Sequence, residues 1–373
     1  MPRTIRGRFL DQVILPVFFL SASLHAQWIT GFYESQNGVE PVASIPWSKY
    51  THIVHFAVTP GIDRDGNASI ILRRLGQSDL SEITQLVVSR PPGKKLLLCI
   101  MDNARDRNAF SQSTAPAMIG TFVRRIANFV NSHGYDGVDI DWEINVDAKR
   151  YTQLLLQLRG EMPTKVITAD MGNGSGREDV ASASQSYVDQ FNIMCYDMDT
   201  PGNGFSWYND ALFQSGNTHV MTCDWRVNPF LKAGVAPAKI GIGLPFYGRR
   251  WQGVTKARVN GNFSASTVLY NQLVADATRW QPQNRFYDSE FKSNYLSIPS
   301  MNEFDSYTGL DEIRDAASWI STQGFGGAMT FSLHYEYLSG ETGDARHPLS
   351  TALYDALSSS HDREQKARLT VSP

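Results

Sequence analysis

The sequence is poor in cysteine. Only three cysteines occur in 373 residues, Cys99, Cys195 and Cys223, so they cannot all pair within one chain. This low density excludes a small fold held together mainly by disulfides. Cys99 and Cys195 lie inside apolar runs. We therefore predict that these two thiols are small buried side chains.

The sequence also lacks an excess or a cluster of positive charge. It contains 34 lysines and arginines against 37 aspartates and glutamates, which gives a formal net charge of -3. Lysine and arginine form no stripe along the chain. A mildly acidic protein of this kind binds polyanions poorly, so nucleic acid is not expected as a partner.

No apolar run near the N-terminus is long enough to span a bilayer. Three arginines within the first eight residues precede the apolar stretch Val13 to Leu24, and the small residue Ala26 follows. This order is typical of a signal peptide. We predict cleavage near Ala26, a secreted or periplasmic location and no stable membrane anchor. The alternative is a buried N-terminal helix.

Short apolar segments rich in β-branched and aromatic residues follow along the chain. Segments with helical periodicity separate them. The predicted strands begin at Trp28, His52, Lys95, Gly137, Val166, Gln190, Lys239 and Gly327.

Two of the predicted helices have clear apolar stripes at the i, i+3, i+4, i+7 spacing. The first lies between the third and fourth strands. Its apolar residues are Ile119, Phe122, Val123, Ile126, Phe129 and Val130. The second covers residues 311–322, just before the last strand, with Ile313, Ala316, Ala317 and Ile320 in its stripe.

The alternation of strands and helices predicts parallel strands joined by helical crossovers. Eight such repeats close a (β/α)₈ barrel, the TIM barrel, which belongs to the α/β class. An open doubly wound sheet is the competing topology. Its dinucleotide-binding form requires a glycine-rich fingerprint after the first strand, and no such fingerprint is present.

Two regions depart from the simple repeat. Residues 251–307 are too long for a strand-to-helix connection and carry their own aromatic pattern, with Tyr270, Trp280, Tyr287 and Tyr295. We interpret them as a small α+β insertion between the seventh and eighth strands of a barrel that covers residues 27–358. Residues 359–373 are polar without an apolar period and predict a loosely held tail.

The segment Tyr135 to Glu143, YDGVDIDWE, is the most informative for chemistry. Alternate side chains of a strand point to opposite faces, so Asp139, Asp141 and Glu143 share one face. Neighbouring acids in this row are roughly 6.5 to 7 Å apart along the strand. We predict that the row points into the barrel, with Glu143 at the end where barrel active sites lie.

Two other interpretations of these acids remain open. Polar and apolar residues also alternate in an ordinary half-exposed strand. However, parallel barrel strands are covered on both faces, and three acids without an interleaved cation are costly there unless they share protons. Crowding of this kind raises carboxyl pKa values, which suits a general acid. The second alternative is a divalent metal site, for which no further ligands are evident.

This segment resembles the DGxDxDWE signature of the family 18 glycoside hydrolases, with all eight positions present from Asp136 to Glu143. Further segments are similar to family strands in the same order. They are GFY at Gly31, MCYD at Met194, GLPFYGR at Gly243 and GFGGAMTFSL at Gly324. FDSYTGLDEI, from Phe304, resembles the segment that leads into the last barrel helix of the family. Together these segments cover most of the chain from Trp28 to about Ser358.

The resemblance implies substrate-assisted, retaining cleavage of N-acetylglucosamine polymers, an exception to the usual two-carboxylate scheme. By motif position, Glu143 protonates the leaving oxygen and the acetamido oxygen of the substrate attacks the sugar carbon. Asp141 orients and stabilises the acetamido group, and Asp139 shares a proton with Asp141. Tyr196 donates a hydrogen bond to the acetamido oxygen. No metal or organic cofactor is implied.

The resemblance also implies substrate-binding residues. Met194 lines the floor of the site, Asp197 bonds the bound sugar, and Tyr33 of the GFY segment is expected in the same group. The expected partner is a polysaccharide or oligosaccharide that contains N-acetylglucosamine.

Two positions depart from the family pattern. The family usually carries SxGG after the third strand, where this chain has CIMD, so Cys99 replaces the serine that supports the innermost aspartate. The family also usually has a tryptophan on the last strand as the floor of the central subsite, where this chain has Phe331. Phenylalanine still stacks on a sugar, but with less area and without an N–H group.

Further aromatic residues follow the sixth and seventh predicted strands, where the active face of a barrel is built. We predict that some of Trp207, Tyr247 and Trp251 stack on sugars, the alternative being loop packing.

The functional hypothesis is therefore a chitinase-like hydrolase. The alternatives are an endo-β-N-acetylglucosaminidase, a hydrolase directed at peptidoglycan, and a glycan-binding barrel with weak activity. Retention of Glu143, Asp141 and Tyr196 favours catalysis over binding alone.

Overall fold

The computed structural model describes residues 27–34, 39–72, 77–102, 105–172, 174–198, 204–213 and 221–371. The predicted signal peptide lies outside these ranges. None of the helices within them is long and apolar enough to cross a bilayer.

The core of the molecule is a closed barrel of parallel strands, which confirms the predicted fold class. Around the barrel the order is β1-β14-β8-β7-β6-β5-β4-β2, and pairing of β1 with β2 closes it. Each strand coincides with one of the eight predicted segments. Their bounds are β1 (Trp28–Glu34), β2 (His52–Ile62), β4 (Lys95–Met101), β5 (Gly137–Asp141), β6 (Val166–Met171), β7 (Gln190–Ile193), β8 (Ile240–Pro245) and β14 (Gly327–Phe331). A short strand, β3 (Ala68–Ile71), pairs antiparallel with the end of β2.

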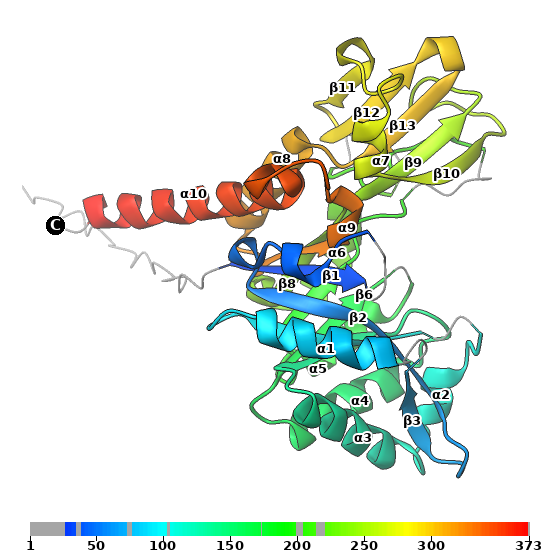
Figure 1. Ribbon diagram of the computed structural model, residues 1–373, viewed down its shortest axis with the longest axis vertical. Helices are drawn as coiled ribbons and strands as arrows, with labels where there is room; N and C mark the ends of the chain where they lie inside the picture. The colour runs from blue at the N-terminus through cyan, green and yellow to red at the C-terminus, as the bar shows by residue number, and fades with distance from the viewer. Residues whose placement is uncertain are drawn as a thin grey trace, which may run out of the picture.

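Helices cover the outside of the barrel (Figure 1). Their bounds are α1 (Gln77–Ser89), α2 (Ala109–Ser113), α3 (Ile119–Ser132), α4 (Ala148–Glu161), α5 (Arg177–Ser184), α6 (Cys223–Lys232), α8 (Leu310–Gln323), α9 (Leu333–Glu336) and α10 (Pro348–Val371). The two predicted stripes occur on α3 and α8. Every member is buried except Phe129, which is half-buried and still packs on the core. Their apolar faces therefore hold the helical layer against the strands.

A five-stranded antiparallel sheet is inserted between β8 and β14, in agreement with the predicted insertion between the seventh and eighth barrel strands. The sheet has the order β10-β9-β13-β12-β11 and forms a lobe apart from α3 and α4 (Figure 1). Its elements are β9 (Tyr247–Gln252), β10 (Ser264–Leu269), α7 (Tyr270–Ala275), β11 (Arg285–Asp288), β12 (Ser293–Ile298) and β13 (Glu303–Tyr307). Tyr247 begins the first lobe strand and does not end the barrel strand, which stops at Pro245.

Buried ion pairs fix the lobe sheet. Arg279 Nε contacts Glu303 Oε1 at 2.6 Å, and Arg250 Nη2 contacts Asp305 Oδ2 at 2.9 Å. Both carboxylates are fully buried. Arg250 also lies 3.4 Å from Glu303 Oε1, so Arg250 joins both carboxylates, and removing it would leave the buried charge of Asp305 unpaired.

The C-terminal residues differ from the predicted tail. Helix α10 begins at Pro348 and continues to Val371. Its first half buries Leu349, Leu353 and Leu357, which are spaced four residues apart. The second half contains glutamate, glutamine, lysine, arginine and alanine, which are good helix formers, so the helix can continue without an apolar stripe.

Candidate active site

The carboxylate row of β5 lies as the alternation predicted. Asp139 and Asp141 point into the barrel, with exposed fractions of 0% and 6%. The alternate residues Val138, Ile140 and Trp142 belong to the outer hydrophobic core. Trp142 stacks on Phe110 with ring centroids 4.9 Å apart. This packing fixes the direction of the strand end that carries the acids.

Glu143 follows directly after β5, and its backbone is held from two sides. Asp102 Oδ2 accepts hydrogen bonds from the backbone N–H groups of Glu143 at 2.5 Å and of Ile144 at 2.8 Å. Arg177, at the start of α5, donates from Nη2 to the carbonyl oxygen of Glu143 at 2.7 Å. The side chain is therefore positioned through its backbone while its carboxyl group stays accessible to solvent.

A third buried carboxyl group lies beside the β5 acids. Asp170 of β6 is 2% exposed and accepts a hydrogen bond from Asn192 Nδ2 at 3.1 Å. Thr168, on the same face of β6, donates to Asp139 Oδ1 at 2.5 Å. The interior therefore contains one more acid than the row predicted from β5.

These buried acids resist ionisation. Burial raises the pKa of Asp139, and hydrogen bonds from Thr168, Cys99 and Asp170 partly oppose this rise. Burial followed by the charges of Glu143 and Asp139 raises the pKa of Asp141 well above its usual range. Burial and the charge of Asp139 do the same for Asp170. The three groups therefore share protons near neutral pH.

Glu143 differs from these acids because solvent reaches its carboxyl group. The surrounding protein nevertheless removes water from around it, which raises its pKa, and the charges of Asp102 and Asp197 add to the rise. No donor from the described part of the chain is bonded to this carboxyl group. A protonated acid with an open face can transfer its proton to a ligand.

Gly172 makes room for the acid. A Cβ atom at this position would lie 2.8 Å from Glu143 Oε2 and 3.3 Å from Met194 Cε. Gly172 also lines a cavity of about 470 Å³ that extends between α5 and α6, with Trp225 and Arg226 among its walls. The acid is therefore separated from this cavity by a residue without a side chain.

The segment after β7 is attached to α6 in two ways. Cys195 forms a disulfide with Cys223, the first residue of α6, with Cα atoms 4.8 Å apart. Arg226 Nη1 donates to the carbonyl oxygens of Met194 and Tyr196. Cys195 is therefore not the free buried thiol that the sequence suggested, because the packing of α6 on β7 brings a second cysteine beside it.

Tyr196, Met194 and Asp197 are brought together near Glu143 by this segment. The pKa of the Tyr196 phenol is raised well above its usual range, first by burial and then by the neighbouring Tyr247. The phenol therefore stays protonated and remains a hydrogen-bond donor. Asp197 accepts from Arg249 Nη2 of β9 at 2.7 Å, which ties the lobe to the barrel mouth.

An aromatic cluster forms the floor beside Tyr196. The ring of Phe331 lies 6.5 Å from that of Tyr196, 5.6 Å from Phe32 and 5.2 Å from Phe56. Tyr247 lies 5.9 Å from Tyr196. Phe331 is only half-buried, so one side of its ring is available to a ligand.

The structure does not bring three of the predicted substrate-binding residues to this site. Tyr33 points outward, and its hydroxyl donates to the carbonyl oxygen of Glu40 at 3.0 Å. Because strand side chains alternate, the neighbouring Phe32 takes the inward position. Trp207 and Trp251 are 3% and 1% exposed and belong to the outer hydrophobic core. Both pack inside the loop and lobe interior, whereas Tyr247, the third residue of that prediction, lies beside Tyr196.

Several functional residues were missed by sequence reasoning. Asp170 occupies an inward position of the predicted strand VITADMG, and applying the same alternation to that strand would have found it. Asp102 ends the segment CIMD, which was considered only for its cysteine. The roles of Arg177 and Arg226 carry no sequence signal, because both act on backbone carbonyls of distant segments.

The described residues contain no group of three His, Cys, Asp or Glu side chains arranged to hold a metal ion. The Asp139 carboxyl group instead accepts a hydrogen bond from Thr168, and burial raises the pKa values of both Asp139 and Asp141.

Comparison with known proteins gives distant relatives over most of the barrel. Chitinase A1 of Niallia circulans is 26% identical over an alignment of 270 positions that covers 61% of this chain and 38% of the relative. Chitotriosidase-1 of Mus musculus is 24% identical over 59% of this chain and 53% of the relative. Class V chitinase of Arabidopsis thaliana is 27% identical over 70% of this chain and 72% of the relative. The chain thus spans 38% and 53% of the bacterial and mouse relatives.

Solved structures share the fold at lower identity. A group IV chitinase of Ostrinia furnacalis in complex with allosamidin has a TM-score of 0.75 at 18% identity, over 90% of this chain and 99% of that one. A class V chitinase variant of Nicotiana tobaccum in complex with NAG4 has a TM-score of 0.75 at 18% identity, over 89% of this chain and 99% of that one. The family profile "Glycosyl hydrolases family 18" matches residues 28–336. This chain therefore belongs to glycosyl hydrolase family 18.

Proposed function

We propose that this protein is a secreted hydrolase that cleaves β-1,4 bonds in N-acetylglucosamine polymers, with retention of configuration at the anomeric carbon. The observation that carries the proposal is the position of Glu143. It is the solvent-accessible member of a group of otherwise buried acids at the barrel mouth, its pKa is raised, and its carboxyl group has no bonded donor in the described ranges. The names of several relatives, among them Chitinase A1 and Class V chitinase, agree with this substrate class.

In the proposed first step, protonated Glu143 gives its proton to the glycosidic oxygen as the bond to the anomeric carbon breaks. The acetamido oxygen of the same sugar forms a new bond to that carbon from the opposite face. Positive charge develops on the acetamido group, and Asp141, the nearest inward acid, stabilises it. In the second step water attacks the anomeric carbon, the bond between that carbon and the acetamido oxygen breaks, and the attacking water gives a proton back to Glu143.

The other residues of the site orient the sugar. Tyr196 keeps its proton and donates a hydrogen bond to the acetamido oxygen. Phe331 supports the apolar face of the sugar ring, and Asp197 accepts hydrogen bonds from its hydroxyl groups. Because Arg226 holds the carbonyls of Met194 and Tyr196, the donor geometry is set before the substrate binds.

The proposed export from the cytosol is supported by the disulfide between Cys195 and Cys223. Disulfides persist in oxidising compartments and are rare in reducing ones. This support is independent of the N-terminal sequence.

Purified full-length protein incubated with chitin oligosaccharides, an N-glycosylated protein and peptidoglycan tests the proposal. We expect cleavage of the oligosaccharides and, by NMR of the first products, the β-anomer. Activity should survive dialysis against a chelator. Binding of oligosaccharides without cleavage would instead support a glycan-binding barrel. Cleavage of only the glycoprotein or only the peptidoglycan would show that the substrate is that glycan and not chitin.

A further inference from the structure

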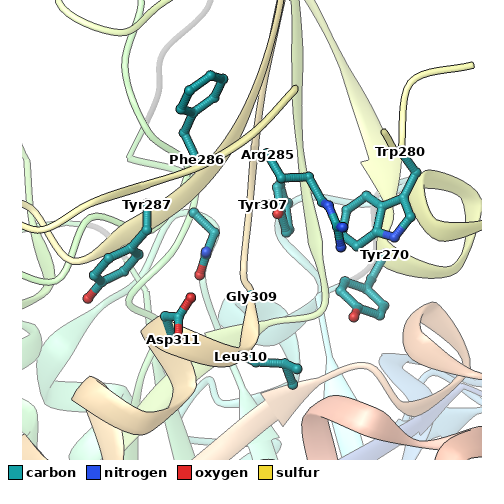
Figure 2. A pocket seen from close by; sticks show the side chains of 10 residues that line it. Tyr270, Trp280, Arg285, Phe286, Tyr287, Tyr307, Gly309, Leu310 and Asp311 are labelled. Carbon is teal, nitrogen blue, oxygen red and sulfur yellow. The ribbon is translucent and has the colours of Figure 1, made fainter. Parts of the chain in front are cut away.

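The lobe contains a second pocket, apart from the barrel mouth. It has a volume of about 260 Å³ and lies between the lobe sheet and the N-terminus of α8 (Figure 2). Its lining includes three of the four aromatic residues that the sequence marked in the insertion, Tyr270, Trp280 and Tyr287. None of its described lining residues belongs to the aromatic cluster around Tyr196. The catalytic site therefore does not account for this pocket.

Aromatic rings form the walls of the pocket. Trp280 meets the ring of Tyr307 edge-on at 5.3 Å and that of Tyr270 at 6.0 Å. The guanidinium group of Arg285 lies over the Trp280 ring, 5.2 Å from its centroid, as Figure 2 also shows. Rings that brace one another in this way are rigid and lose little entropy when a ligand binds.

An exposed apolar side chain lies at the rim of the same pocket. Leu310 is 38% exposed and lines the pocket. The ring of Phe286 points away from the pocket side chains (Figure 2) and stacks on Tyr295 with ring centroids 5.4 Å apart. The apolar surface offered to a ligand therefore comes from the aromatic walls and Leu310.

A few polar groups complete the lining. Asn294 is 7% exposed, and its Oδ1 accepts a hydrogen bond from the backbone N–H of Glu312 at 3.3 Å. Within the described ranges its amide nitrogen has no hydrogen-bond acceptor, so this donor is available to a ligand in the pocket. Asp311 supplies an acceptor and Arg285 a donor at the rim.

The combination favours a neutral, polyhydroxylated ligand. One positive and one negative side chain at the rim do not select an ion of either sign. Aromatic walls suit the apolar face of a pyranose ring, and sparse donors and acceptors suit its hydroxyl and amide groups.

We propose that this lobe pocket is a second saccharide-binding site, which takes an N-acetylglucosamine residue of a polymer whose other part occupies the barrel mouth. The choice of this sugar rests on the proposed function, whereas the aromatic pocket itself does not. Two contacts on one polymer raise the effective concentration of substrate at the catalytic site, so the pocket matters for polymeric chitin and not for short oligosaccharides.

Two lobe variants test the site, Arg285→Ala and Trp280→Leu, with Tyr354→Ala as the matched control. Tyr354 lies on α10 outside the pocket, is 37% exposed and has Lys49 over its ring, so it copies the cation-ring contact of Trp280. Binding to colloidal chitin is measured by co-sedimentation with Glu143→Gln in every protein, to prevent hydrolysis. Turnover of a soluble chitin tetramer is measured in the same variants with Glu143 intact.

We expect both lobe variants to weaken chitin binding by roughly three- to tenfold, and the control to bind as the parent does. Turnover of the soluble tetramer should not change. Arg285 is exposed, so its variant keeps the test valid if Trp280→Leu fails to fold.

Equal chitin binding by all folded variants would overturn the proposal. So would an equal loss on the soluble tetramer, because the pocket would then belong to the catalytic cleft. The proposed function fails separately, if the protein with intact Glu143 cleaves no soluble oligosaccharide. The pocket is then judged on co-sedimentation alone.

Discussion

Substitution of Glu143 by glutamine separates proton donation from every other property of the site. The amide keeps the volume of the carboxyl group beside Gly172, and the backbone contacts from Asp102 and Arg177 do not involve the side chain. General acid catalysis contributes about 10²- to 10⁴-fold, which is about 3 to 5 kcal/mol of transition-state stabilisation. We therefore expect Glu143→Gln to lower kcat by at least this factor. The free energy of unfolding at neutral pH should be equal to or higher than that of wild type, since the amide replaces a carboxyl group whose pKa burial raises in the folded protein.

The assay is hydrolysis of a soluble chitin oligosaccharide over a range of pH, with thermal melts of the same samples. Glu161→Gln is the matched control, because Glu161 is an exposed carboxylate at the end of α4, outside the site. The raised pKa keeps Glu143 protonated above the usual range of a glutamate, so wild-type activity should fall as pH rises through that value. Turnover by Glu143→Gln within tenfold of wild type would refute the assignment of this residue as the acid.

Three further predictions concern the surroundings of the acid. Phe331→Trp should strengthen oligosaccharide binding by about 1 kcal/mol at unchanged melting temperature if Phe331 floors the subsite. A melting temperature that falls without tighter binding, as overpacking would cause, would make Phe331 a core residue. Asp170→Asn should stabilise the protein at neutral pH. The pKa of Asp170 is higher in the folded than in the unfolded protein, so the wild type loses stability as pH rises above the unfolded pKa, and asparagine removes this loss. The difference in the free energy of unfolding between this variant and wild type, measured in denaturant melts, should disappear below about pH 4, the pKa of an unfolded aspartate. A difference that does not change with pH would contradict the raised pKa of Asp170. Replacing Cys195 and Cys223 by alanine should cost about 3 to 4 kcal/mol for a cross-link between residues 28 apart, measured by urea unfolding. Unchanged stability would show that the bond is not formed.

The architecture was predictable because periodicity reports burial directly. Strands that are covered on both faces consist of apolar runs, which are visible in the sequence. Eight such strands with helical segments between them are compatible with few topologies. The acid row of β5 was predictable for a related reason. Three acids on one face of a strand that must be covered have few structural explanations other than a shared protonation site.

The errors arose where contacts depend on distant segments. Tyr33 was misplaced by one residue, which in a strand reverses the face, and Phe32 takes the inward position. Trp207 and Trp251 are in the predicted loops, but nothing local indicates that Phe291 and the lobe sheet would cover them. The pairing of Cys195 with Cys223 depends on how α6 packs, which the spacing of the cysteines does not report.

The hydrogen-bond partners of Asp139 explain why Glu143, and no other acid of the group, should exchange protons with the substrate. Thr168 donates to Oδ1 of Asp139, but Oδ2 is buried and no hydroxyl or amide of the described residues donates to it. A hydrogen bond from Cys99 or Asp170 requires a thiol or a carboxyl proton, and burial raises the pKa of both groups. The inner acids therefore retain a proton among themselves that solvent cannot reach. Glu143 is coupled to them through Asp141 but faces solvent, so it is the member of the group whose proton can leave and return during a catalytic cycle.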